Sequence, residues 1–342
     1  MKVGIDLGYR YTKIKGMWRD DTGTNKGTIA VIPSITGEPR NLKYQTDMDK
    51  LNELDYIRAI VGQKEYFVGS LADRQSDVVY FSMDERKLYE ESSAVLLKTA
   101  IALLLLHSEG DKDIRLVTGL PVTYYADYKN RFAEVLDGEH KVLLNLAGSK
   151  YKRVFNIDGH GIRVIPQPLG TLFMKILDTD GKLKDKALAN KRVGVIDIGF
   201  KTTDLVVCDK LEYIDKLSRS TTTAMHTAYQ IISDQIREQF GVDKPVFQLD
   251  EIVRSGFIKI EGKTYSLQEI TDYAFRSVAE KLIAEIKSLW PNRWELETII
   301  LTGGGAEALG SLLAGRLETS VVQEGAQMAN VQGYTRLASR LW

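Results

Sequence analysis

Cysteine and histidine are scarce in this chain, whose 342 residues include a single cysteine, Cys208, and only four histidines. One cysteine cannot form an intramolecular disulfide, and this small set of cysteine and histidine side chains offers no spacing typical of a zinc site. Cys208 lies in an apolar run that predicts a strand, which favours a small core residue over a reactive thiol.

The chain also lacks an excess of either charge, since Lys+Arg and Asp+Glu both number 46. Zero net charge argues against direct nucleic-acid binding, although not against DNA contact through a partner, and it permits self-association. The most apolar predicted helix has an uninterrupted apolar run of only seven residues, Ala100–Leu106, too short to cross a bilayer. Residues 1–6 predict a strand and not a signal peptide. We therefore expect a cytoplasmic protein with no membrane contact.

One pattern occurs twice in the chain, at an offset of 191 residues (197 − 6). In each copy an apolar strand ends in Asp-x-Gly and a second strand leads back. The first copy spans 3–13 and the second spans 194–204; the aligned pairs are Asp6 and Asp197, Gly8 and Gly199, Tyr9 and Phe200, Arg10 and Lys201, and Thr12 and Thr203. Because the chain is also longer than one core usually supports, the repeat predicts two similar α/β domains.

The repeated turn has the residue types that a metal-bound polyphosphate requires. A carboxylate at a buried strand end can hold a divalent cation, directly or through water, and the glycine lets backbone amides approach phosphate oxygens. One copy alone favours an ordinary hairpin with a turn-forming Asp and Gly, whereas two aligned copies favour a site. The candidates are Asp6 and Asp197 for the metal, and Gly8, Lys13, Gly199, Thr202 and Thr203 for the phosphates.

Two further motifs fit such a site. A predicted strand over 299–302 runs into Gly303-Gly304-Gly305, and a helix starts at Ala306, a layout that brings backbone close to a flat or anionic ligand. The alternative is a tight strand–helix turn. Gln167 stands between two prolines at a strand-to-helix break, where its neutral amide could orient a water for attack on a terminal phosphate. The alternative is a surface glutamine in a proline-stiffened hinge.

In this order, the four motifs resemble those of the actin/chaperone/sugar-kinase ATPase superfamily, over nearly the whole chain. The resemblance implies an α/β fold of two ribonuclease-H-like, actin-type domains flanking a central nucleotide cleft. The first would span 1–165 with an insertion at about 34–75, and the second 166–326 with a small subdomain at about 215–270. The last predicted helix, about 327–342, would pack back onto the first domain.

The resemblance also implies roles for individual residues around Mg²⁺ and ATP or ADP. Asp6 and Asp197 would organise the magnesium, and Gln167 would position the hydrolytic water. The residues implied in nucleotide binding are Gly8, Tyr9, Thr12, Lys13, Gly199, Lys201, Thr202, Thr203, Gly303, Gly304, Gly305 and Ala306.

Several sequence features narrow the resemblance to the ParM/StbA-type actin-like proteins of plasmids and archaea. They are the segments Ile32–Ser34, Thr118–Pro121 and Ala329–Tyr334, together with the compact length. The turn of the first copy (turn one) departs from actin and the chaperones, because bulky Tyr9 and Arg10 stand where those proteins have small or hydroxylated residues. Backbone amides are therefore expected to bind phosphate there.

This branch implies an ATPase that polymerises with bound ATP, hydrolyses it and then disassembles, in plasmid or DNA segregation. Its partners would be further copies of the chain and a DNA-bound adaptor protein. Two alternatives stay open at this point: a small-molecule, sugar-type kinase of the same fold, and a nucleotide-dependent cytoskeletal scaffold with little turnover.

Overall fold

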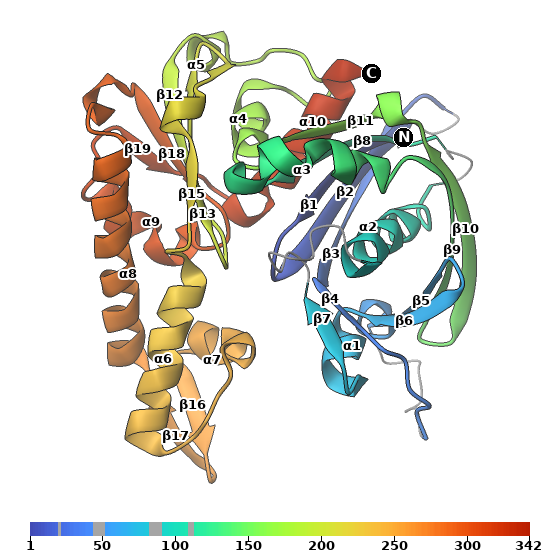
Figure 1. The fold of residues 1–342 in the computed structure, drawn as a ribbon, viewed down its shortest axis with the longest axis horizontal. Coiled ribbons are helices and arrows are strands. Elements are labelled where there is room, and N and C mark those ends of the chain that lie inside the picture. Colours follow the sequence, from blue (N-terminus) through green and yellow to red (C-terminus); the bar gives the residue numbers. More distant parts are fainter. Residues whose placement is uncertain (20–21, 44–51, 82–90, 109–112) are drawn as a thin grey trace. The chain divides into compact units, whose positions relative to one another are not determined.

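The computed structural model describes residues 1–19, 22–43, 52–81, 91–108 and 113–342. The chain forms two compact units: unit 1 comprises Met1–Lys186 and Met328–Trp342, and unit 2 comprises Ala187–Gln327 (Figure 1). The boundary predicted at 165/166 thus differs from this division, which lies at 186/187. The physical reason is that helix α4 (Leu169–Ile176) packs against strand β11 (Ile162–Pro166).

The first sheet of unit 1 has five strands in the order β11-β8-β1-β2-β3. Strand β1 lies at its centre, antiparallel to β2 and parallel to β8. The C-terminal end of β1 therefore lies beside the start of β2 and the end of β8. The bounds are β1 Lys2–Leu7, β2 Tyr11–Arg19, β3 Asn25–Pro33 and β8 Arg115–Leu120.

The second sheet of unit 1 has six strands in the order β10-β9-β5-β6-β4-β7. It is built from hairpins, of which the longest joins β9 to β10. The bounds are β4 Ile35–Gly37, β5 Ile57–Val61, β6 Lys64–Val68, β7 Val79–Phe81, β9 Gly138–Leu146 and β10 Ser149–Ile157.

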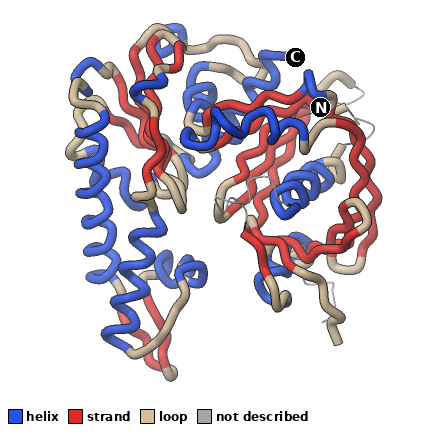
Figure 2. Tube along the Cα trace, viewed as in Figure 1, coloured by secondary structure: helices blue, strands red, loops and turns tan. Residues whose placement is uncertain are grey.

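Helix α2 lies between the two sheets of unit 1 (Figure 2). It packs against β2 and β3 on one side and against β5 and β9 on the other. This position explains why its sequence is apolar almost all round, since side chains such as Leu96, Ile101 and Leu104 are fully buried. The helices of unit 1 are α1 Ser70–Gln75, α2 Glu91–Leu104, α3 Val122–Glu134, α4 and α10, which spans Ala326–Leu341; short 3-10 helices cover Glu53–Asp55 and Gly159–Gly161.

Unit 2 repeats the central arrangement of unit 1. Its main sheet has the order β14-β13-β12-β18-β19, with β15 also paired to β13. Strand β12 is antiparallel to β13 and parallel to β18, as β1 is to β2 and β8. The bounds are β12 Arg192–Ile198, β13 Thr203–Asp209, β14 Glu212–Tyr213, β15 Arg219–Thr221, β18 Thr298–Thr302 and β19 Ser320–Val322.

Helices α6 and α8 cover this sheet and share its apolar core, which is separate from the core of unit 1. A two-stranded hairpin of β16 and β17 stands apart from the main sheet. The remaining bounds are α5 Lys186–Ala189, α6 Met225–Phe240, α7 Asp250–Ser255, α8 Gln268–Leu289, α9 Ala306–Ala314, β16 Phe257–Ile260 and β17 Lys263–Ser266; short 3-10 helices cover Asp215–Leu217, Val246–Gln248 and Arg293–Glu295.

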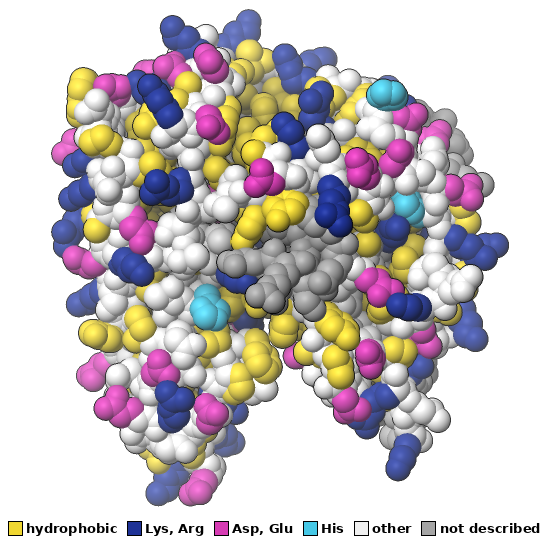
Figure 3. Space-filling view, in the orientation of Figure 1, with side chains coloured by type: hydrophobic (Ala, Val, Ile, Leu, Met, Phe, Trp, Pro, Cys, Tyr) yellow, Lys and Arg dark blue, Asp and Glu magenta, His cyan; other side chains and the backbone are white. Residues whose placement is uncertain are grey.

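The single cysteine and the balanced charges of the sequence have clear places in the structure. Cys208 is buried in β13, as predicted, and burial raises the pKa of its thiol to about 12, so the thiol stays protonated at neutral pH. On the face drawn in Figure 3, Lys and Arg side chains are interspersed with Asp and Glu side chains. This mixture fits a chain of zero net charge.

Helix α10 meets α4 at two glycines. A Cβ on Gly333 would lie 1.7 Å from the carbonyl oxygen of Gly170 and 2.8 Å from the nitrogen of Met174. Any side chain here would push the helices apart. Glycine is otherwise unfavourable in a helix interior, so this close contact is what requires it.

We predict that Gly333→Ala lowers the Tm by about 5 °C or more, because overpacking outweighs the gain in helix propensity. The matched control is Gly315→Ala at the end of α9, where φ is −67° and the nearest atom would be 3.7 Å from the new Cβ. It should leave the Tm unchanged or slightly raised. A Gly333→Ala protein at least as stable as the Gly315→Ala protein would contradict the packing described.

Candidate functional site

Turn one joins β1 to β2 in unit 1. The amide of Gly8 donates to the carbonyl of Tyr11 at 3.1 Å, and a Cβ on Gly8 would lie 2.9 Å from that oxygen. Asp6 is 2% exposed, and Lys13 lies directly opposite it on β2. The Lys13 Nζ is 3.0 Å from Asp6 Oδ2. The buried carboxylate of turn one thus has a cation of its own.

The structure brings Gln167 to the same carboxylate. Gln167 follows β11, and its Nε2 donates to Asp6 Oδ1 at 2.7 Å. Asp6 therefore holds Lys13 with one oxygen and Gln167 with the other. Three of the predicted site residues, separated by up to 161 positions in the chain, meet at the end of β1.

The other side chains of turn one have roles inside unit 1. The hydroxyl of Thr12 is fully buried and lies 2.9 Å from the hydroxyl of Ser34. The amide of Ser34 donates to Arg10 O at 2.9 Å, which ties β3 to the turn. The ring of Tyr9 stacks on Phe81, with centroids 6.0 Å apart. The Thr12 hydroxyl thus stabilises the conformation of the turn through Ser34.

Turn two joins β12 to β13 in unit 2 and is closed in the same way. The amide of Gly199 donates to Thr202 O at 2.9 Å, and a Cβ on Gly199 would lie 2.8 Å from that oxygen. Asp197 is 4% exposed at the end of its strand. The backbone of the repeat seen in the sequence is therefore the same in both units.

The two turns differ in what faces the carboxylate. Opposite Asp197, in the register where turn one has Lys13, lies Asp204, which is 2% exposed. Ser220 and Thr202 donate hydrogen bonds to Asp204. Like charges directly across a strand pair destabilise a sheet unless a cation lies between or beside them. Asp204 is the last residue of the second copy of the repeat and was not among the predicted site residues; its place seven residues after Asp197, as Lys13 follows Asp6, was the available signal.

Hydroxyl groups support the returning strand of turn two. Thr203 is fully buried, and its Oγ1 donates to Thr223 O at 2.7 Å. Glu285, on α8, accepts from the hydroxyls of Thr221 at 2.6 Å and Thr223 at 2.8 Å. Among the threonines of this turn, Thr202 is the more exposed.

Helix α6 begins directly against turn two. The amides of Met225 and His226, in its first turn, donate to Gly199 O at 3.3 Å and Phe200 O at 2.7 Å. These bonds satisfy helix-terminal donors that would otherwise need another acceptor. Burial, with the positive charge of Lys201 as a second cause, lowers the pKa of His226, which keeps its ring neutral at neutral pH.

The three glycines after β18 have different surroundings. Gly303 has a φ of +86°, and a Cβ there would lie 2.2 Å from Asp197 Oδ1. A Cβ on Gly305 would lie 2.5 Å from Ile198 Cγ2, and the Gly305 amide donates to Ile198 O at 2.9 Å. Gly304 is exposed and has no atom nearer than 4.0 Å to such a Cβ. Ala306, which starts α9, is buried. Gly304 is thus the exposed position of the loop, while its neighbours seat the loop on turn two.

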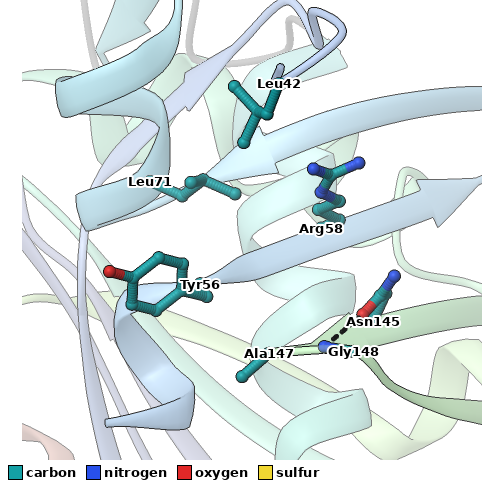
Figure 4. Close-up of a pocket in the computed structure, with 7 residues that line it drawn as sticks. All are labelled: Leu42, Tyr56, Arg58, Leu71, Asn145, Ala147 and Gly148. Carbon is teal, nitrogen blue, oxygen red and sulfur yellow. Dashed lines mark hydrogen bonds between the residues drawn. The ribbon is translucent and has the colours of Figure 1, made fainter. Parts of the chain in front are cut away.

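A separate small cavity lies in unit 1 between β5, α1 and the β9–β10 turn (Figure 4). None of the predicted site residues lines it. Arg58 is its one charged lining residue, and Asn145 accepts a hydrogen bond from Gly148 N at 2.9 Å. The cavity is therefore distinct from the two turns.

Neither membrane nor metal signatures appear in the part of the chain that the structure describes. No helix there is both long and apolar enough to span a bilayer. No three His, Cys, Asp or Glu side chains there are grouped as a metal site would need.

Comparison with protein families follows the same division of the chain. The family model for the N-terminal domain of actin-like proteins matches residues 4–170, and that for the C-terminal domain of MreB-like archaeal actin homologues matches 195–315. The chain belongs to the actin-like proteins. The predicted family and the predicted two-domain α/β fold are thus confirmed. A comparison with curated protein sequences gives no match.

Solved structures resemble this actin-like protein over its whole length. A ParM in a 15-stranded filament from Clostridium botulinum is 25% identical, with a TM-score of 0.78 over 98% of this chain and 99% of that one. A non-polymerisable quadruple mutant of pCBH ParM is also 25% identical, with a TM-score of 0.75 over 97% of both chains. An archaeal actin homologue in complex with ADP is 21% identical, with a TM-score of 0.75 over 99% of this chain and 100% of that one.

The glycine loop gives a direct test of the site. Gly303→Ala should lower the free energy of unfolding by about 1–3 kcal/mol through its backbone conformation alone, with a clash against Asp197 in addition. Gly304→Ala is the matched control and should unfold like the wild type. Thermal unfolding of both variants decides between them. Equal Tm values would contradict the distinction drawn between the two glycines.

Proposed function

We propose that this actin-like protein binds Mg-ATP, assembles into filaments and hydrolyses the nucleotide, and that hydrolysis drives disassembly. The observation that carries the proposal is the pair of glycine-closed Asp turns, one in each unit, with Gln167 bonded to the first and the glycine loop seated on the second. Each set has residue types suited to the phosphates or the metal of a nucleotide. The ADP-bound archaeal homologue supports this assignment.

The phosphates would be held mainly by the backbone of the turns. The amides of Gly8 and Gly199 close the two turns. The ring of Tyr9 is stacked on Phe81, so Tyr9 would contribute its amide. Since the hydroxyls of Thr12 and Thr203 are buried, these residues would bind through their turns. Thr202 offers its hydroxyl, and the ammonium groups of Lys13 and Lys201 add positive charge. The exposed backbone of Gly304, between Gly303 and Gly305 and before Ala306, would pass along the adenosine.

The carboxylates of turn two fit a divalent cation. Asp197 and Asp204 are both buried and face each other across β12 and β13, an arrangement that a cation would stabilise. Asp197 would hold magnesium through an oxygen, and Asp6, already neutralised by Lys13, would act through water. Bound Mg²⁺ would supply charge neutralisation for the β- and γ-phosphates.

Gln167 would orient the attacking water. Its Nε2 is engaged by Asp6 at 2.7 Å, which fixes the amide plane and turns its Oε1 away from that carboxylate. An amide oxygen held in this way can accept a hydrogen bond from a water molecule and orient it, without removing its proton. Positioning of this kind is how neutral glutamines contribute to phosphoryl transfer to water.

Self-assembly and DNA segregation belong to the same proposal. The Clostridium botulinum relative forms a 15-stranded filament, and zero net charge favours self-association over direct binding to DNA. The role proposed for the protein is in the cytoplasm, on plasmid or other DNA, through a DNA-bound adaptor protein.

Asp197→Asn should reduce phosphate release by at least about 100-fold, because it removes the charge that holds the metal. Asp209→Asn, at the opposite end of the same strand pair, is the matched control and should retain the wild-type rate.

Gln167→Ala should slow release by about 10–100-fold with ATP affinity largely kept. A wild-type rate in Asp197→Asn would refute the metal assignment, and lost ATP binding in Gln167→Ala would make Gln167 structural.

Assembly is tested by pelleting and electron microscopy with and without Mg-ATP, read beside phosphate release. We expect filaments with Mg-ATP that disappear as phosphate is released. Absence of polymer at high protein concentration would contradict the proposal. Transfer of phosphate to a sugar would indicate a kinase instead, and stable filaments without phosphate release would indicate a scaffold.

A further inference from the structure

Two side chains of α10, one helical turn apart, hold the segment that contains Gln167. Tyr334 Oη donates to the carbonyl oxygen of Gln167 at 2.9 Å, and Tyr334 is fully buried. Asn330 Oδ1 accepts from the amide of Thr171 at 3.0 Å and from its hydroxyl at 2.9 Å. Both ends of the segment 167–171 are thereby fixed to one helix within unit 1.

Strand β8 completes this support. Gln167 N donates to Leu120 O at 2.8 Å. A Cβ on Gly119 would lie 2.0 Å from Tyr334 Oη and 2.9 Å from the Cα of Gln167, so this glycine provides the space that the tyrosine hydroxyl occupies. The segments Thr118–Pro121 and Ala329–Tyr334, which the sequence analysis used only as family features, therefore meet at Gln167.

We infer that Tyr334 is a positioning residue for ATP hydrolysis, acting through Gln167; the inference rests on the role proposed for Gln167 above. The backbone of Gln167 is held at its N–H by Leu120 and at its carbonyl by Tyr334, while its side chain is held by Asp6. The Gln167 carbonyl also accepts from the amide of Gly170 at 3.1 Å, so loss of the Tyr334 hydroxyl removes one donor and loosens the peptide plane that follows Gln167. The range of positions open to the Gln167 amide then widens. A small misplacement of a water-orienting group is costly in rate, even when binding is unchanged.

The variant Tyr334→Phe removes the hydroxyl and keeps the buried ring. We expect kcat for phosphate release, normalised to pelleted protein, to fall about 3–10-fold, while KM and ADP affinity stay within about twofold. Tyr66→Phe is the matched control, because it removes a tyrosine hydroxyl that donates to Glu91 elsewhere in unit 1. It should leave kcat unchanged. A fall in Tyr66→Phe equal to that in Tyr334→Phe would overturn the inference.

A double-mutant cycle with Gln167→Ala separates positioning from a general structural effect. If Tyr334 acts through Gln167, Tyr334→Phe lowers kcat in the wild type and not in the Gln167→Ala background. Equal falls in both backgrounds would overturn the inference.

Thr171→Val removes one of the two donors to Asn330 with little change of shape, and a fall of about 2–3-fold with the same dependence on Gln167 is expected. This second variant decides the question if Tyr334→Phe does not fold.

The cycle also keeps the two proposals distinguishable. A wild-type rate in Gln167→Ala would overturn the role proposed for Gln167, and this inference with it. A slow Gln167→Ala beside an unchanged Tyr334→Phe would overturn only the role of Tyr334.

Discussion

The candidate site depends on one interaction: that between a buried carboxylate at a strand end and the residue opposite it in the hairpin. Asp6 and Asp197 occupy equivalent places in two hairpins that close through the same glycine hydrogen bond. Opposite Asp6 lies Lys13, and the charges compensate each other at 3.0 Å. Opposite Asp197 lies Asp204, so this position pairs two carboxylates where turn one pairs a carboxylate with an ammonium group. The duplicated fold therefore carries two chemically different turns.

Under the proposed function, this difference gives the turns separate tasks. The Asp6–Lys13 pair of turn one, bonded to Gln167, would hold a water-orienting amide in place. Turn two, with two buried carboxylates and a glycine loop against it, is suited to a cation and the nucleotide that accompanies it. Helix α10 contributes to the first task, because it supports the Gln167 segment through Asn330 and Tyr334.

The sequence was sufficient for features that are local or repeated. The doubled turn, the glutamine between prolines and the glycine loop each depend on a few adjacent residues, so their existence could be predicted. Partners across the chain could not: the bond from Gln167 to Asp6 joins residues 161 positions apart, and that from Tyr334 to Gln167 joins residues 167 positions apart. The boundary near 165 differs for the same reason, since the place of α4 depends on packing against β11.

The measurement that tests the account most directly is Mn²⁺ binding, followed by electron paramagnetic resonance, in the presence of a non-hydrolysable ATP analogue. Wild-type protein, Asp6→Asn and Asp197→Asn would be titrated in parallel, with folding checked by thermal unfolding. The account predicts one Mn²⁺ per chain, with affinity lowered much more by Asp197→Asn than by Asp6→Asn. Equal losses, or a larger loss in Asp6→Asn, would contradict the division of tasks between the two turns.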